Sequence, residues 1–278
     1  MNNLLENFLT DLEFRSKSKE TYNRFKYVVQ KFIEFTKKDA NYDKKDIVTY
    51  IVALKRNGCS ESYQRFIFYV LKSFYQSNKI PWEFRPKEAP PESTHVTPFL
   101  TVEQGQKMME LAKVKLRDYI ILRIGMTLGL RRIEIRDLNR KDYVPPKLFV
   151  LDTAKHGNPR PLDVDYETIQ ALNSYLSKRT DNDEALFVSN QVKRFSLVGL
   201  SDIFTKYKKM AGIKGERMGM HSMRRGLATG LRKAGMGTDD ITKFMGWKTP
   251  FMVNRYIQIS GQEISEKVRR VNPFLKKS

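Results

Sequence analysis

A proline-rich stretch divides the chain and limits the folds that it can adopt. Residues 85–98, RPKEAPPESTHVTP, contain four prolines and almost no apolar side chains. Because proline fixes φ and lacks an amide donor, such a segment favours an extended linker over a helix or a central strand. We therefore predict a first domain over residues 1–84, a linker over 85–98 and a second domain over 99–278.

The first part has helical periodicity throughout. Apolar residues recur three and four positions apart, which places them on one face of a helix. Ser18 and Ser60 stand where helix N-caps are expected, and Asn57-Gly58 stands where a helix would end. This pattern predicts a compact bundle of four helices. The residues predicted to face its core are Leu4, Leu5, Phe8, Leu9, Leu12, Tyr22, Phe25, Val29, Phe32, Ile33, Ile47, Ile51, Leu54, Tyr63, Ile67, Leu71 and Phe74.

The second part is also mainly helical, but in one stretch the spacing of apolar residues changes from that of a helix to that of a strand. Thr101 and Gln104 fit a capping box that opens a helix. The runs KLFVLDT and RPLDVD are typical of strands, and HGNP between them has the composition of a hairpin turn. We predict a mainly α chain whose second domain has one small antiparallel sheet. Its further helices are expected at about 115–127, 166–178, 201–210 and 221–234, then from Thr238 and from Thr249.

Charge and composition narrow the class of partner. The chain has 51 Lys and Arg against 31 Asp and Glu, a net charge of +20, and 34 of the basic residues follow residue 93. Such an excess of positive charge predicts a polyanionic binding partner, because each phosphate that the protein neutralises releases counterions. The alternative is that the basic charge serves solubility alone. Cys59 is the single cysteine, so an internal disulfide is excluded and no Cys/His cluster suggests zinc. We expect a cytoplasmic, nucleoid-associated protein without a membrane span, secretory signal, metal or cofactor.

The segment HSMRRGLATG, residues 221–230, combines a tightly packing helix with basic groups at its start. His221, Arg224 and Arg225 lie in the first turn, where the helix dipole disfavours positive charge. His221 and Arg224 are three residues apart and share a face, and the free amides of a helix start also attract anions. The pattern predicts a bound anion; the alternative is a helix start with fortuitous basic residues.

Five elements of the second part, taken in order, resemble the tyrosine recombinases of the phage-integrase and Xer type. That family's pattern is Arg, Lys, His-x-x-Arg, His or Trp, and then Tyr. The matching segments are TLGLRRIEI, TAKHGNPR, HSMR, FMGW and NRYIQ, which contain Arg131, Lys155, His221 with Arg224, Trp247 and Tyr256. The resemblance covers essentially the whole chain and implies a SAM-like core-binding domain joined by a linker to a catalytic domain.

The resemblance implies strand cleavage by a covalent route that needs neither metal nor ATP. Tyr256 would attack a DNA phosphodiester and form a 3′-phosphotyrosine with release of a 5′-hydroxyl. His221 would act as the base and Lys155 as the acid for the leaving oxygen. Taken by itself, however, a lysine at a hairpin edge such as Lys155 is more often a solvated side chain than a catalytic acid.

The remaining residues of the pattern would hold the phosphate. Arg131 and Arg224 would bind its non-bridging oxygens, and Trp247 would add one donor. Glu134, three residues after Arg131, would support and orient that arginine. The alternatives are a surface Arg131–Glu134 pair worth at most about 1 kcal/mol and a tryptophan that merely packs in the core.

DNA contacts outside this set are expected from Lys19, Arg24 and Lys26 and from Arg225, although a solvated face explains the first three equally well. The implied partner is double-stranded DNA, with the bundle and the catalytic domain on opposite sides of the duplex. In the family, the segment after the nucleophile docks on a neighbouring protomer and couples four subunits on two DNA sites. We expect this homotetramer here and a monomer or dimer off DNA, and the sequence leaves open whether an accessory protein takes part. The alternative is a tail that packs on its own domain.

Two other functions fit parts of the pattern. A type IB topoisomerase shares the chemistry but relaxes a single duplex as a monomer. A sequence-specific DNA-binding protein that has lost catalysis would retain the charge but not the complete set of residues. The short, two-part chain favours a site-specific recombinase over a topoisomerase. The complete residue set favours it over a DNA-binding protein that has lost catalysis.

Overall fold

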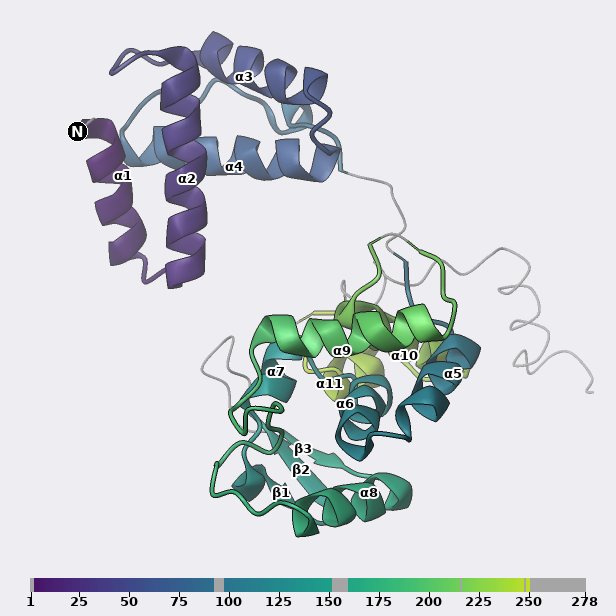
Figure 1. The fold of residues 1–278 in the computed structure, drawn as a ribbon. Coiled ribbons are helices and arrows are strands. Elements are labelled where there is room, and N and C mark those ends of the chain that lie inside the picture. The colour runs from purple at the N-terminus through teal and green to yellow at the C-terminus, as the bar shows by residue number, and fades with distance from the viewer. Residues whose placement is uncertain (1–2, 93–97, 152–159, 216, 248, 251–278) are drawn as a thin grey trace, which may run out of the picture. The chain divides into compact units, whose positions relative to one another are not determined.

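The computed structural model describes residues 3–92, 98–151, 160–215, 217–247 and 249–250 (Figure 1). The chain divides into two compact units, residues 1–95 and 96–278. Each unit has its own hydrophobic core.

The N-terminal unit is the expected four-helix bundle. Its helices are α1 (Asn3–Phe14), α2 (Lys19–Thr36), α3 (Lys44–Arg56) and α4 (Glu61–Ser77). Ser18 and Ser60 cap α2 and α4, since each hydroxyl accepts a hydrogen bond of 3.3 Å from the backbone amide three residues later. Local cap chemistry therefore fixed two helix starts as predicted.

Aromatic side chains fill the core of the bundle. Phe8, Phe32 and Phe74 are fully buried, and the rings of Phe8 and Phe74 meet edge to face with centroids 5.6 Å apart. Large rings bury much apolar area per residue and prefer such edge contacts, so few side chains suffice to hold four helices together.

The structure differs from the predicted linker at its beginning. Residues 86–88 form a short 3₁₀ helix, and Lys44 of α3 forms an ion pair of 2.8 Å with Glu88. Arg65 of α4 donates a hydrogen bond of 2.5 Å to the carbonyl of Pro90. Because these contacts hold the chain on the bundle as far as Pro90, the first half of the segment is part of the N-terminal unit rather than an extended connection.

The C-terminal unit is mostly helical, and it places one helix at the centre of the others. Helix α6 has four fully buried residues, Ile120, Ile121, Leu122 and Ile124, and contacts α5, α7, α8 and α10. In the described part of this unit the α-helices are α5 (Val102–Ala112), α6 (Leu116–Thr127), α7 (Arg132–Asp137), α8 (Tyr166–Ser177), α9 (Leu197–Met210), α10 (Met220–Lys233) and α11 (Thr238–Phe244).

Two helix starts in this unit show how caps set boundaries. Thr101 and Gln104 form the predicted capping box, with reciprocal hydrogen bonds of 3.1 and 3.2 Å. Helix α9 begins at Leu197, four residues before the predicted Ser201, because the hydroxyl of Ser196 accepts the amide of Gly199 at 3.0 Å. The helix predicted from Thr249 lies outside the described residues.

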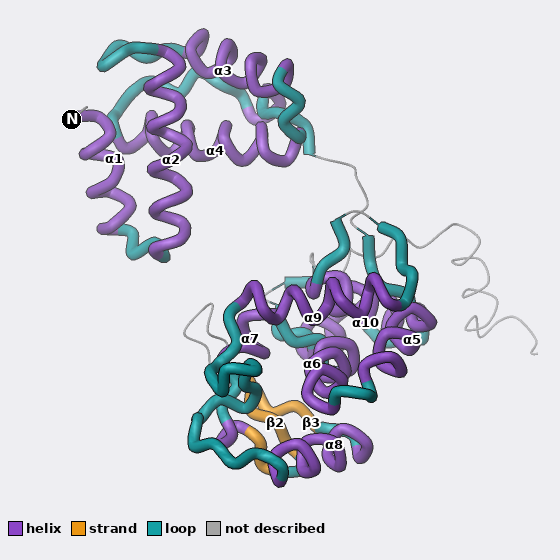
Figure 2. The backbone as a smooth tube through the Cα atoms, viewed as in Figure 1, coloured by secondary structure: helices purple, strands orange, loops and turns teal. Residues whose placement is uncertain are grey.

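A three-stranded antiparallel sheet, β1-β2-β3, packs beside α8 (Figure 2). It consists of β1 (Tyr143–Val144), β2 (Lys147–Val150) and β3 (Arg160–Asp163), and the register pairs Val150 with Arg160. The small sheet confirms the predicted fold class, while β1 was not predicted because two residues carry too little periodicity. The predicted HGNP turn lies outside the described residues.

Helix α10 is fixed by a close approach of backbone to backbone. The amide of Leu100 donates to the carbonyl of Ser222 at 3.1 Å, so the segment before α5 runs along the helix. A Cβ atom on Gly226 would overlap the Leu100 carbonyl oxygen. Glycine at this position therefore allows the first turn of α10 to lie against that segment.

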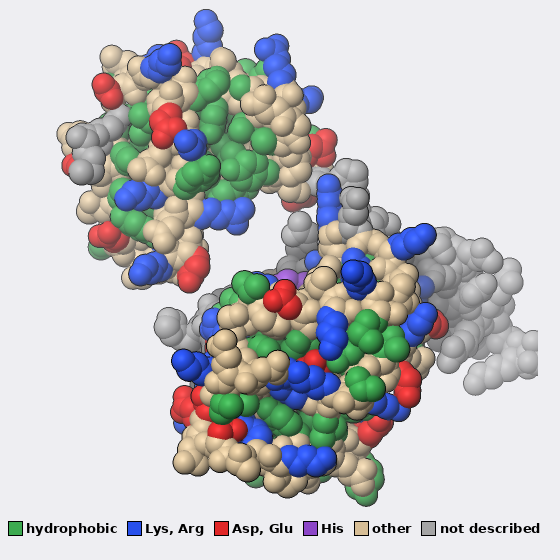
Figure 3. Space-filling model, in the orientation of Figure 1, with side chains coloured by type: hydrophobic (Ala, Val, Ile, Leu, Met, Phe, Trp, Pro, Cys, Tyr) green, Lys and Arg blue, Asp and Glu red, His purple; other side chains and the backbone are tan. Residues whose placement is uncertain are grey.

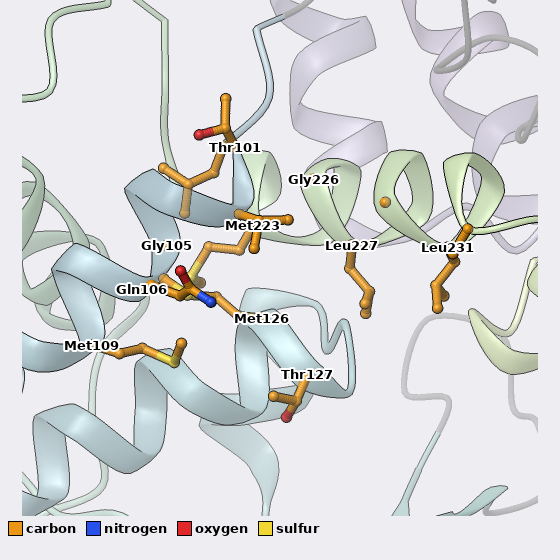
Figure 4. Close-up of a pocket in the computed structure, with 14 residues that line it drawn as sticks. Thr101, Gly105, Gln106, Met109, Met126, Thr127, Met223, Gly226, Leu227 and Leu231 are labelled. Carbon is orange, nitrogen blue, oxygen red and sulfur yellow. The ribbon is translucent and has the colours of Figure 1, made fainter. Parts of the chain in front are cut away.

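An apolar groove of about 380 Å³ lies beside α10, between α5 and α6 (Figure 4). Leu227 and Leu231 project toward it from α10, and Met109 and Met126 reach it from α5 and α6. His221, Arg224 and Arg225 are not among the residues that line the groove.

Substituting Gly226 with Ala should destabilise the protein by about 1–3 kcal/mol, because the added methyl group meets backbone that cannot turn away. Gly230→Ala is the matched control: it lies in the same helix, and a Cβ there meets no atom within 4 Å. Alanine should raise stability at that position by about 0.5–1 kcal/mol. Urea unfolding measures both effects, and equal changes at the two positions would contradict the close approach.

Candidate active site

The start of α10 has no side-chain cap. Its N-cap residue is Gly219, whose backbone is extended. The amide and the hydroxyl of Ser222 both donate to the Gly219 carbonyl, at 2.8 and 2.5 Å. A helix start without a capping side chain leaves room for an external acceptor, and the bound anion stays a prediction.

Arg224 is buried directly behind this helix start, with 5% of its surface exposed. Its Nη1 donates to the carbonyl of Gly129 and its Nη2 to the carbonyl of Met245. Its guanidinium carbon also lies 5.4 Å from the ring centroid of Trp247. Backbone carbonyls accept these buried donors and carry no opposing formal charge.

Arg131 lies at the N-cap position of α7 and is held by Glu134. The Nη1 of Arg131 donates to Oε1 of Glu134 at 2.6 Å, and its backbone amide donates to Oε2, also at 2.6 Å. Glu134 is 3% exposed, so this contact is a buried pair and not the surface pair that was the alternative. The Nη2 of Arg131 donates to the Gly246 carbonyl at 3.2 Å.

Both arginines therefore contact the same turn after α11. Arg224 binds the carbonyl of Met245, and Arg131 binds the next carbonyl, that of Gly246. Segments far apart in the sequence, α7, α10 and the α11 turn, are joined by these bonds. The structure brings Arg131, Glu134 and Arg224 together in one cluster.

His221 completes the described part of the cluster. Its imidazole is partly open to solvent. Burial by its neighbours, followed by repulsion from Arg225, Arg132, Arg224 and Arg131, lowers the pKa of His221 below its ordinary value. The neutral imidazole, which can accept a proton, is therefore favoured near neutral pH.

Trp247 is half-buried and packs on a small cluster formed by Ala228, Ile241 and Met245. The stacking contact with Arg224 places it at the edge of the arginine cluster as well. Trp247 therefore fits both interpretations, that of a packed core tryptophan and that of a residue at the border of the site.

Two predicted site residues, Lys155 and Tyr256, lie outside the described residues, and their roles stay predictions. Arg225 donates to the carbonyl of Pro98 at 2.9 Å, so it holds the segment that leads into α5. A contact of Arg225 with DNA also stays a prediction.

The three basic candidates of α2 do not form one patch. Lys19 and Lys26 are seven residues apart and share a helix face, whereas Arg24 lies about 140–160° around the helix from them. Arg24 stacks on Phe66 of α4, with its guanidinium carbon 3.9 Å from the ring centroid. On the face shown in Figure 3, Lys and Arg side chains are scattered around a hydrophobic area between α2, α3 and α4. DNA contacts from Lys19, Arg24 and Lys26 stay predictions.

Sequence reasoning missed one basic residue of the cluster. Arg160, the first residue of β3, places its Nη2 3.4 Å from Oε2 of Glu134. The available signal was its position at the end of the predicted hairpin, five residues after Lys155. That signal could not be used because the hairpin register is not encoded locally.

Two kinds of feature are absent from the described part of the chain. Within the described ranges, no three His, Cys, Asp or Glu side chains form a group able to hold a metal ion. None of the helices in the described part of the chain combines the length and apolarity that a membrane crossing requires.

Comparison with known proteins agrees with this geometry. Residues 98–263 match the phage integrase family, and residues 4–80 match the N-terminal SAM-like domain of phage integrases. The first match covers more than half of the chain and contains every residue of the cluster. The chain belongs to the phage integrase family.

Some relatives align along nearly the whole chain. Tyrosine recombinase XerA of Pyrococcus furiosus is 26% identical over 274 residues, which cover 97% of this chain and 94% of that protein. A crystal structure of XerA recombinase has a TM-score of 0.56 at 22% identity and covers 98% of this chain and 99% of its own. A lambda integrase dimer bound to a COC′ core site has a TM-score of 0.76 at 16% identity, with 94% and 96% covered. These two structures share the fold of this chain.

His221 should titrate below the usual histidine pKa of about 6.5, and Arg225→Gln should raise its pKa, because Arg225 is the strongest of the repelling charges. Since the folded pKa is the lower one, His221 favours folding above the usual histidine pKa and loses that contribution as pH falls through the folded pKa. NMR titration measures this, with His221→Gln identifying the signal among three histidines. A His221 pKa above 6.5 would refute the electrostatic picture.

Proposed function

We propose that this chain is a site-specific DNA recombinase that cleaves and rejoins DNA strands through a 3′-phosphotyrosine intermediate. The observation that carries the proposal is the convergence of Arg131 and Arg224 on one turn beside the uncapped start of α10. Family membership and relatives named tyrosine recombinases support the same reaction.

The two arginines suit a phosphodiester whose charge increases during the reaction. Each presents a planar set of donors, and each is already oriented by Glu134 or by backbone carbonyls before DNA binds. Donors that need no reorientation stabilise the transition state most, and losing one typically costs about 3 kcal/mol, or a hundredfold in rate. In this proposal, Arg131 and Arg224 hold the non-bridging oxygens and Trp247 adds one donor.

Proton transfer is assigned to His221, Lys155 and Tyr256. A phenol has a pKa of about 10, so it needs a base at neutral pH. The lowered pKa of His221 keeps its imidazole able to accept the Tyr256 proton. The phenolate oxygen then bonds to phosphorus, the bond to the 5′-oxygen breaks, and Lys155 protonates that oxygen. Attack by another 5′-hydroxyl reverses these steps, so the bond energy is retained without ATP.

The assembly in this proposal is a homotetramer on two DNA sites, formed from monomers or dimers. Solved relatives support it, since crystal structures of lambda integrase contain a dimer bound to a COC′ core site and a tetramer bound to a Holliday junction. Phosphate contacts from Arg225 and α2 would supply affinity that depends strongly on salt. Such a protein would act in the cytoplasm on the nucleoid, with an accessory protein as an optional partner.

Two experiments separate this function from its rivals. Relaxation of supercoiled plasmid without any site requirement would favour a type IB topoisomerase. Binding to a selected site without any covalent adduct would favour a DNA-binding protein that has lost catalysis. Selection from a random DNA pool by the purified protein supplies the site for both tests.

On a nicked half-site of the selected sequence, wild-type protein should form a protein–DNA adduct that survives denaturant. Tyr256→Phe should abolish the adduct, because the variant lacks the attacking oxygen. Tyr166→Phe is the matched control, since this tyrosine is 73% exposed and lies in α8. Gel electrophoresis after denaturation measures the yield. An adduct of undiminished yield with Tyr256→Phe would disprove the assignment of the nucleophile.

A further inference from the structure

Glu134 is shared by two arginines. Its Oε1 accepts Nη1 of Arg131 at 2.6 Å. Its Oε2 accepts the Arg131 backbone amide at 2.6 Å and lies 3.4 Å from Nη2 of Arg160. The carboxylate is buried, with 2% of its side chain exposed, whereas Arg131 and Arg160 keep 23% and 19% of theirs. The two guanidinium groups are therefore the parts of this triad that an anion can approach.

The charges of the triad do not cancel. One carboxylate and two guanidinium groups leave a net charge of +1. Without Arg160, Glu134 would neutralise Arg131 alone, and that pair would present no net charge to a phosphate. Because Coulomb interactions over a few ångströms are strong in a partly buried site, the second arginine decides how much attraction Arg131 can exert.

The turn after α11 leaves space for Arg160. Gly246 has a left-handed backbone with φ of +60°, and a Cβ atom there would overlap Nη1 of Arg160. The carbonyl of the same glycine accepts Nη2 of Arg131 at 3.2 Å. The absence of a side chain at this position lets Arg160 pack against the turn that also orients Arg131 and Arg224.

From these contacts we infer that Arg160 is a positioning residue of the reaction. It acts through Glu134: it balances the carboxylate so that the charge and orientation of Arg131 remain directed to the scissile phosphate. The inference rests on the proposed function and adds to it a residue outside the family's Arg, Lys, His, Arg, Trp and Tyr set.

The first test is the single-turnover rate of adduct formation on the nicked half-site. Arg160→Met should lower the rate about tenfold to a hundredfold, no more than the loss of a direct donor. Arg160→Lys keeps the charge and should recover most of the rate. Arg123→Met is the matched control, since Arg123 is 15% exposed and pairs with Asp165 and Glu167 away from the site. Its folded fraction should react at the wild-type rate.

The second test separates charge from a merely structural effect. A methylphosphonate at the scissile position lacks one charged oxygen, so it needs less compensation by the arginines. If Arg160 acts through charge, the gap between Arg160→Met and wild type should shrink several-fold on this substrate. An unchanged gap would overturn the inference. Rescue by a 5′-thiolate leaving group, which needs no proton, would also overturn it by assigning Arg160 to protonation of the leaving oxygen.

Failure of the inference differs from failure of the proposed function. If wild-type protein forms no adduct on its selected site, the recombinase reaction itself is refuted. If wild type reacts and Arg160→Met reacts at the same rate, the reaction stands and only the role of Arg160 is lost. Thermal unfolding of each variant establishes the folded fraction used in every rate.

Discussion

The C-terminal unit depends on the hydrogen bonds that the buried guanidinium of Arg224 donates to two backbone carbonyls. A charged group with 5% exposure is tolerated only when its donors are satisfied, and here the carbonyls of Gly129 and Met245 satisfy them. These bonds draw two loops toward the first turn of α10. The same bonds that make the burial possible therefore assemble the wall of the site.

Electrostatic balance follows from that arrangement. Several arginines around one helix start would repel each other, and a single buried carboxylate, Glu134, offsets part of this charge. Burial lowers the pKa of His221 most, and the remaining positive charge lowers it further. The charge that attracts a phosphate therefore also helps to keep a nearby imidazole neutral.

The sequence predicted those parts of the molecule that depend on local chemistry. Three helix starts are set by hydrogen bonds between residues only three positions apart, so they could be identified without tertiary structure. These bonds involve Ser18, Ser60 and the Thr101–Gln104 capping box. Glu134 and Arg224 were recognisable from their spacing to other motif residues. Arg160 was not, because its relation to Glu134 depends on strand register and on the conformation of a distant glycine. The attachment of residues 85–90 to the bundle was missed for the same reason, since Lys44 and Arg65 lie far away in sequence.

The turn after α11 has a further consequence. The acceptors for Arg224 and Arg131 belong to neighbouring residues, Met245 and Gly246, whose Cα atoms are about 3.8 Å apart across one trans peptide. A rigid covalent unit thus sets the separation between the two guanidinium groups. A shift of α11 would move both acceptor carbonyls together, so the spacing that they offer to the two arginines would persist.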